Sequence, residues 1–126
     1  MGGQSMKYED LYDEFINLFP EDKEFFKKLE EETGAERSIG MHIMFGLVVS
    51  PYILRLLEKE PEKAKKAFEF IEKMETSEDD RIANVADVSV LEILITEEDG
   101  GIEKIRKYLG PKSLASVTHF AQYFNL

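Results

Sequence analysis

Three polar side chains lie within the two most apolar stretches of the chain and are the first candidates for a chemical role. His42 lies in the apolar run 39–49, while Asn84 and Asp87 lie three residues apart in the run 82–95. Residues three apart share one face of a helix, so Asn84 and Asp87 should point the same way. The three residues predict either an internal polar network or a polar pocket that could bind a small molecule.

Asp87 raises a further question because its neighbours in the sequence are alanine and valine. A carboxylate buried among apolar side chains needs a hydrogen-bonding or cationic partner, since an isolated buried charge is costly. We therefore expect an arginine to pair with Asp87. The candidate partners are Arg37, Arg55 and Arg81.

The sequence contains no pattern typical of a metal site or a catalytic nucleophile. His42 and His119 are the only histidines, and the absence of cysteine excludes thiolate ligands and disulfides. Neither histidine lies in a metal-binding helical motif, and the acidic stretch 97–101 lacks the alternating ligands of a calcium loop. Phosphate-binding glycine loops and nucleophile elbows are also missing. We therefore expect no catalytic residue, no metal, no cofactor and no enzymatic activity.

Acidic residues dominate the charged positions, and the chain has a formal net charge of −10 at pH 7. This charge opposes binding to nucleic acids and to anionic membranes, and it suits a basic protein partner. The candidate partner-binding residues form two clusters, Glu30, Glu31 and Glu32 in one, and Glu75, Glu78, Asp79 and Asp80 in the other. If successive helices run antiparallel, both clusters fall at the same end of the domain. Alternatively, these acids stabilise helix ends and keep the protein soluble.

The elements that would position these residues are all predicted to be helices. Apolar residues recur every three or four positions in the segments 8–19, 25–29, 61–74, 102–109 and 114–124. Two further helices, near 38–59 and 78–95, are apolar on nearly all sides and should be central. Ser77 and Asp80 approximate a capping box for the second of these. Pro20 and Pro51 each either kink a helix or separate two helices.

The fold class that follows is all-α, with six or seven helices in one domain of residues 6–126. Residues 1–5 read as a remnant of cloning. The short connections favour antiparallel neighbours in an irregular bundle. A short HEAT-like stack of helical hairpins is the alternative, although the hairpins would be shorter than HEAT units and show no sequence similarity to one another.

The stretch 38–54 carries no charged residue and is close to the minimum of about 17 residues that a membrane-spanning helix needs. It includes Gly40, His42, Gly46, Ser50 and Pro51, which weaken a bilayer helix. A buried core helix is the better interpretation. With no secretory signal at the N-terminus and no cysteine, we expect a cytoplasmic protein without membrane association.

The segment from Arg81 to Glu92 (RIANVADVSVLE), followed by the segment from Lys107 to Leu114 (KYLGPKSL), resembles a poorly characterised family of small bacterial all-helical proteins. The resemblance covers roughly the C-terminal third of the chain. Some members of this kind are suspected immunity proteins, which bind and neutralise a toxin. The resemblance implies a protein-binding role and brings no catalytic residues with it.

Three hypotheses of function follow. The first is a cytosolic immunity-type protein that occludes a basic toxin. The second is a helical adaptor or regulatory module that self-associates or binds another protein, through an exposed apolar groove beside Met41, Met44 and Phe45. The third is a small-molecule binder or enzyme that uses His42, Asn84 and Asp87. The sequence leaves the partner's identity and the oligomeric state open.

Overall fold

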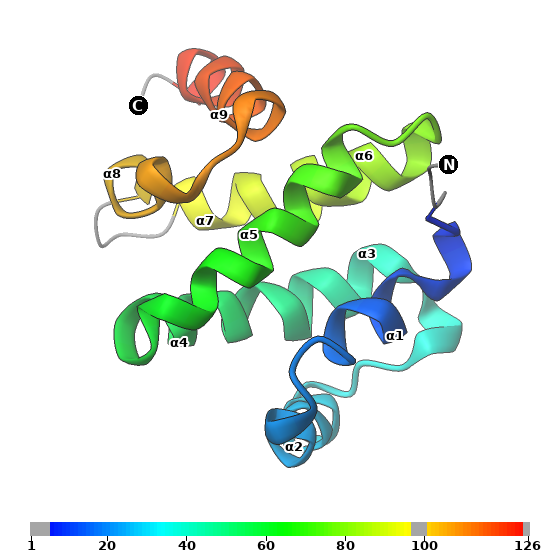
Figure 1. The fold of residues 1–126 in the computed structure, drawn as a ribbon. Helices are drawn as coiled ribbons and strands as arrows, with labels where there is room; N and C mark the ends of the chain where they lie inside the picture. The colour runs from blue at the N-terminus through cyan, green and yellow to red at the C-terminus, as the bar shows by residue number, and fades with distance from the viewer. Residues whose placement is uncertain (1–5, 97–100, 125–126) are drawn as a thin grey trace, which may run out of the picture.

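A computed structural model describes residues 6–96 and 101–124 of the chain. All regular secondary structure in these two ranges is helical, so the predicted all-α class is confirmed (Figure 1). The helices form an irregular bundle in which the two most apolar segments lie at the centre.

The N-terminal part contains two short helices that Pro20 separates. A 3₁₀ turn, η1 (Tyr8–Asp10), leads into α1 (Leu11–Ile16), and Pro20 is the first residue of the next 3₁₀ turn, η2 (Pro20–Asp22), which precedes α2 (Lys23–Thr33). A proline is well placed at the start of a helical turn because its missing N–H would have no partner there. Gly34 ends α2 with φ of 74°, a left-handed conformation that glycine adopts without strain.

The first central helix runs from Met41 to Lys59 without a break. It comprises α3 (Met41–Met44), the π-helical segment η4 (Phe45–Val49) and α4 (Ser50–Lys59), and the short turn η3 (Arg37–Ile39) precedes it. Pro51 therefore lies inside a continuous helix and does not start a new one. Proline removes one α-helical hydrogen bond and crowds the preceding turn. The helix is widened directly before Pro51, where the Ser50 N–H bonds to the Phe45 carbonyl five residues back.

The second central helix has the same construction. It comprises α6 (Asp80–Ala86), the π-helical segment η5 (Asp87–Leu91) and α7 (Glu92–Thr96), and α5 (Pro61–Glu75) precedes it. The predicted capping box is wrong: the N-cap is Asp79, whose side chain accepts a hydrogen bond from the Arg81 N–H at 3.0 Å. Ser77 instead accepts a bond from the Asp79 N–H at 3.0 Å, so it shapes the turn before the cap.

The C-terminal part is divided at Gly110 and Pro111, where the last helix begins. It contains α8 (Gly101–Ile105), the 3₁₀ turn η6 (Arg106–Tyr108) and α9 (Pro111–Phe124). Positions 97–100 of the acidic stretch 97–101 lie outside the described residues.

Helix α5 connects the two central helices. It packs against α4 and α6, and the central helices contact one another through η4 and η5. Figure 1 shows α1 and α2 on one side of this centre and α8 and α9 on the other, with α2 seen nearly end-on beneath α3 and α4. Because α2 lies across the other helices, a regular alternation of turns between two ends of the domain does not describe this part of the fold.

The core is rich in aromatic residues, and Phe15 of α1 is at its centre. The Phe15 ring lies 5.4–6.4 Å from five other rings, those of Phe19, Phe26, Phe45, Tyr52 and Phe70. Phe19 lies between α1 and η2, and the other four rings come from α2, η4, α4 and α5. Met41, Met44 and Phe45 are buried in this core, so none of these three side chains itself offers an exposed apolar surface.

One helix in the described ranges, Met41–Lys59, is long and apolar enough to cross a membrane by length and composition. Half of its most apolar window is buried inside the fold, as in the core helix of a bundle. This burial agrees with the prediction from the sequence that this segment is a core helix.

Candidate functional site

His42 and Asn84 meet between the two central helices, together with a serine that the sequence did not single out. His42 Nδ1 lies 2.7 Å from Ser89 Oγ in η5, and Asn84 Nδ2 lies 3.5 Å from His42 Nε2. Ser50 adds a second link, because its hydroxyl donates to the Ser89 carbonyl at 2.6 Å. The cluster thus joins the first central helix, on both sides of η4, to the second central helix in α6 and η5.

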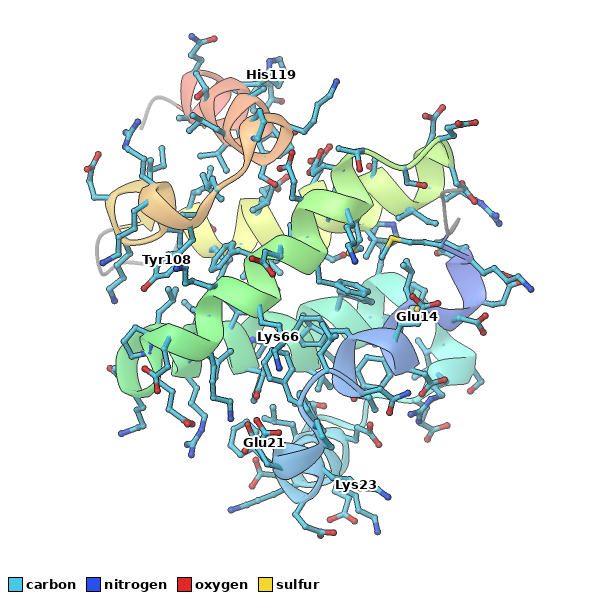
Figure 2. The ribbon with its side chains drawn as sticks, in the orientation of Figure 1. Glu14, Glu21, Lys23, Lys66, Tyr108 and His119 are labelled. Atoms are coloured by element: carbon cyan, nitrogen blue, oxygen red, sulfur yellow. The ribbon has the colours of Figure 1, made fainter. Side chains whose placement is uncertain are left out.

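A serine beside a histidine, with an asparagine at the other ring nitrogen, has the composition of an activated nucleophile. Such a nucleophile must be reachable by a substrate, and Ser89 is only 5% exposed. Its neighbour Ser50 is fully buried. The arrangement therefore favours a structural link between helices over nucleophilic catalysis. The remaining histidine, His119, is exposed on α9, far along the chain from this cluster (Figure 2).

Asp87 lies elsewhere, so the structure brings together two of the three predicted pocket residues. Asp87 meets the carboxyl group of Glu75 at the end of α5, and Ser116 Oγ of α9 donates to Glu75 Oε1 at 3.1 Å. The prediction that an arginine pairs with Asp87 is wrong. Arg37 pairs with Asp13 at 2.7 Å, Arg81 pairs with Asp79 at 2.8 Å, and Arg55 lies over the Phe25 ring.

Burial and the neighbouring Asp87 carboxyl raise the pKa of Glu75 to about 9. Two buried oxygens of the pair, Glu75 Oε2 and Asp87 Oδ1, have no hydrogen-bond partner among the described residues. Two carboxylates at close range cannot both keep their charge cheaply, and one proton on the pair supplies the missing donor. We expect this pair to hold a proton near neutral pH.

Another acidic residue of α5, Glu72, caps the last helix. Its carboxylate accepts bonds from the Lys112 N–H at 3.0 Å and from the Ser113 N–H and hydroxyl at 2.9 and 2.8 Å. Burial acts to raise the pKa of Glu72, but these hydrogen bonds outweigh it and lower the pKa below its ordinary value. The residues around Gly110 and Pro111 include no side chain that could cap the N-terminus of α9. This absence is the one local signal that another element must supply the cap.

The predicted partner-binding acids have different surroundings. Glu31, Glu32, Glu78 and Asp80 are exposed. The other three are used within the fold: Glu30 accepts the Tyr12 hydroxyl at 2.6 Å, Glu75 meets Asp87, and Asp79 caps α6. In the described part of the chain, no hydrogen bond or ion pair joins the cluster on α2 to the cluster around the α5–α6 turn. Their union in one patch stays a prediction.

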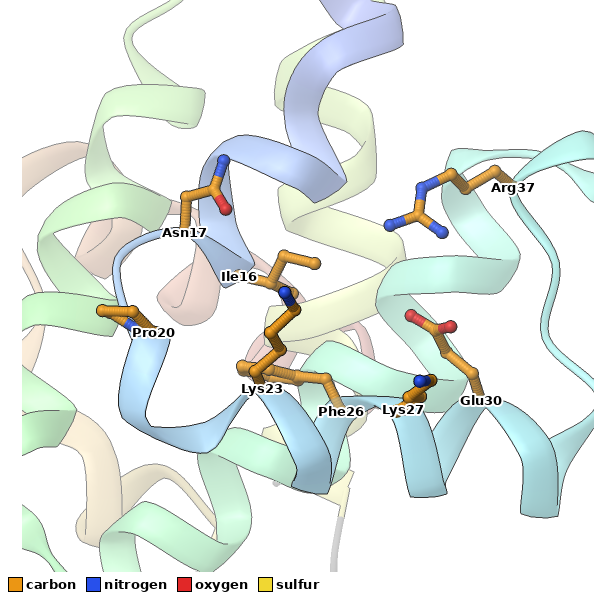
Figure 3. Close-up of a pocket in the computed structure, with 8 residues that line it drawn as sticks. All are labelled: Ile16, Asn17, Pro20, Lys23, Phe26, Lys27, Glu30 and Arg37. Carbon is orange, nitrogen blue, oxygen red and sulfur yellow. The ribbon is translucent and has the colours of Figure 1, made fainter.

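A pocket of about 310 Å³ lies between the end of α1, α2 and Arg37 (Figure 3). Its lining residues are Ile16, Asn17, Pro20, Lys23, Phe26, Lys27, Glu30 and Arg37. Sequence analysis did not predict this pocket, since its residues come from four separate elements, α1, η2, α2 and η3. In the described ranges, no group of three or more His, Cys, Asp or Glu side chains could hold a metal ion.

Comparison with known proteins places the chain in a family. The family model described as a domain of unknown function, DUF7674, matches residues 12–125. The chain belongs to the DUF7674 family. No curated protein and no solved structure is similar enough to match.

The DUF7674 match extends from α1 to the end of α9 and so includes the His42–Ser89 cluster, the carboxyl pair and the pocket. It covers far more of the chain than the C-terminal segments whose resemblance suggested an immunity protein. The family description gives no activity, and these comparisons add no support for that resemblance.

Proposed function

We propose that this DUF7674 protein is a protein-binding domain that occludes a basic partner, in the manner of an immunity protein. The observation that supports the proposal is the excess of exposed acids without a counter-charge. Glu31, Glu32 and Glu36 follow one another around the end of α2, all three are exposed, and none forms an ion pair with another described residue.

A basic partner would gain from such a surface in two ways. Its positive charge would be attracted over about 10 Å at moderate salt, which raises the rate of encounter. Once bound, the rigid helices would block access to the partner's own site. The domain would need no chemistry of its own, which agrees with the burial of Ser89 and with the structural use of Asp87.

The test is co-purification with the product of the adjacent gene, followed by charge reversal. We expect Glu31→Lys with Glu32→Lys to lower the affinity about tenfold or more, because two attractive contacts become repulsive. The matched control is Glu62→Lys with Glu69→Lys, which changes the net charge equally on the outer face of α5, at exposed positions. The control should retain most of the affinity.

Two results would contradict the proposal. One is the absence of any complex together with no protection of cells that express the neighbouring product. The other is equal loss of affinity in both double variants, which would show that only the net charge matters and not the end of α2.

A second candidate function is a helical adaptor that binds through the central helices. Ile39, Leu47 and Val88 are 56%, 39% and 42% exposed, and they flank the His42–Ser89 contact along the chain. A contiguous patch of exposed apolar side chains is typical of a self-association surface. Light scattering that shows a monomer at high protein concentration, unchanged by Leu47→Ser with Val88→Ser, would exclude self-association.

A further inference from the structure

The pocket between α1 and α2 is unusual in an acidic protein because cations dominate its lining. Three of its eight lining residues are positively charged, Lys23, Lys27 and Arg37, and Glu30 is the single acid among them. The remaining side chains include Ile16, Pro20 and Phe26, which provide an apolar floor.

The charges at one end of the pocket already neutralise one another. Arg37 donates two bonds to Asp13 Oδ1, at 3.1 Å from Nε and 2.7 Å from Nη2, and its guanidinium lies 5.0 Å from the centre of the Tyr12 ring. The Tyr12 hydroxyl in turn holds Glu30 Oε2 at 2.6 Å. These contacts fix Arg37 and Glu30 in place, and Figure 3 shows the two side chains facing each other.

The charges at the other end are not neutralised. Lys23 and Lys27 lie four residues apart on α2, where like charges repel. Neither forms an ion pair within the described ranges. In Figure 3 Lys23 extends from α2 toward the side of Ile16 and Asn17, so its ammonium group borders the apolar floor. An anion placed here would relieve the repulsion between the two lysines.

The size of the pocket limits what could fill it. A closed apolar cavity of about 150 Å³ is enough to bind benzene. The pocket has roughly twice that volume, about 310 Å³, and is open to solvent. It therefore has room for one ring or a short alkyl chain together with a charged group.

We propose that this pocket binds a small organic monocarboxylate, with its carboxylate between Lys23 and Lys27 and its apolar group on Ile16 and Phe26. Asn17, whose amide can donate a hydrogen bond, also lines the pocket. This site is independent of the proposed protein-binding function, which depends on the exposed acids beyond Glu30.

The test uses benzoate as the probe and benzyl alcohol as its neutral counterpart, with amide chemical shifts of the full chain measured by NMR during titration. We expect benzoate to shift amides of α1 and α2 in a saturable way, and benzyl alcohol to bind at least about fivefold more weakly. Inorganic phosphate should also bind more weakly than benzoate because it makes no use of the apolar floor.

Variants on α2 locate the site. Lys23→Gln and Lys27→Gln should each weaken benzoate binding about fivefold, and the double variant more. The matched control is Lys28→Gln, on the same helix and with the same change in charge, at an exposed position outside the pocket. It should leave the affinity within about twofold.

Several results would overturn the proposal. They are no saturable shifts with benzoate, equal binding of benzoate and benzyl alcohol, shifts that map outside α1 and α2, phosphate binding as tight as benzoate, or equal weakening by Lys28→Gln and Lys27→Gln. Unchanged circular dichroism of the variants would show that any loss of binding is not a loss of fold.

Discussion

At the residue scale, the carboxyl pair of Glu75 and Asp87 connects folding to pH. Because burial and Asp87 raise the pKa of Glu75 from 4.5 to about 9, the folded chain retains a proton that the unfolded chain loses above about pH 4.5. Folding binds this proton, so its contribution to stability is complete at low pH and falls as pH rises through this window. The direction is opposite to that of the usual ion-paired carboxylate.

We predict that Glu75→Gln removes this dependence. The amide resembles the protonated acid and can donate to Asp87 without a charge. The variant should match the wild type near about pH 5 and exceed its free energy of unfolding near about pH 8.5, as measured by urea denaturation. Glu69→Gln, exposed on the same helix, serves as the control. A difference between variant and wild type that does not change with pH would contradict the shared proton.

Asp22 makes stability depend on pH in the opposite direction. Its Oδ2 accepts the Tyr52 hydroxyl at 2.5 Å and the Lys63 ammonium at 2.6 Å. Burial acts to raise the pKa of Asp22, but these two bonds outweigh it and hold the pKa below the ordinary 3.8. The resulting stabilisation is present above the unfolded pKa and is lost as pH falls through the folded pKa.

We therefore predict that Asp22→Asn lowers the free energy of unfolding by about 1–3 kcal/mol at neutral pH, the usual contribution of hydrogen bonds to a charged group. The difference from the wild type should narrow as pH falls below the unfolded pKa of 3.8, because the unfolded carboxylate then gains a proton before the folded one does. Chemical denaturation across this range measures it. A loss of equal size at both pH values would mean that the asparagine disturbs packing instead.

At the element scale, α9 depends on a cap from another helix. Three bonds from Lys112 and Ser113 end on Glu72 of α5, and the approach is so close that a Cβ atom on Gly110 would lie 2.5 Å from Glu72 Cδ. A side chain at position 110 would therefore have to displace the Glu72 carboxylate from its capping position. The contact holds α9 against the bundle and also gives hydrogen-bond acceptors to the free N–H groups at the start of α9.

We predict that Glu72→Ala destabilises the protein by about 1–2 kcal/mol and speeds hydrogen exchange in the first turns of α9 more than elsewhere. Glu69→Ala, on the same helix and exposed, should have little effect on either. Gly110→Ala should reproduce the local change by displacing Glu72. Exchange that rises uniformly in all helices would show that the cap has no local role.

The elements also show how far sequence reasoning reaches. Periodicity predicted the helices correctly because each buries a stripe that local spacing records, and the Gly110–Pro111 break is a local signal too. Pro51 was ambiguous, since whether a proline separates or bends a helix depends on the packing around it. The Glu72 cap and the Asp87–Glu75 contact were not predictable, because their partners are distant in the sequence and their proximity depends on tertiary packing.

At the scale of the whole molecule, the aromatic core holds together the helices that precede α6 in the sequence. Phe15 contributes from a helix of only six residues, too short to be stable alone, and its neighbours belong to four other elements. The short α1 is thus stabilised by the core that it completes. The pocket beside it could not be predicted for the same reason: α1, α2 and Arg37 come together only when this core is packed.

We predict that Phe15→Ala lowers the free energy of unfolding by about 3–5 kcal/mol, the usual cost of removing a buried ring. Domains of this size are stable by about 5–15 kcal/mol, so a substantial loss of thermal stability should follow. Calorimetry measures it. The variant Leu114→Ala, at a position 37% exposed, should change stability far less. A small effect at Phe15 would mean that α1 is dispensable to the core.

The two π-helical segments predict where relatives of this chain should differ in length. In each, one N–H reaches a carbonyl five residues back, from Ser50 to Phe45 and from Glu92 to Asp87. Removing one residue between the ends of either bond would convert it into an ordinary α-helical bond and leave the flanking turns nearly in register. Relatives should therefore differ by single-residue deletions at 46–49 or 88–91 more readily than elsewhere in these helices. A family alignment with gaps placed at random along the central helices would refute this expectation.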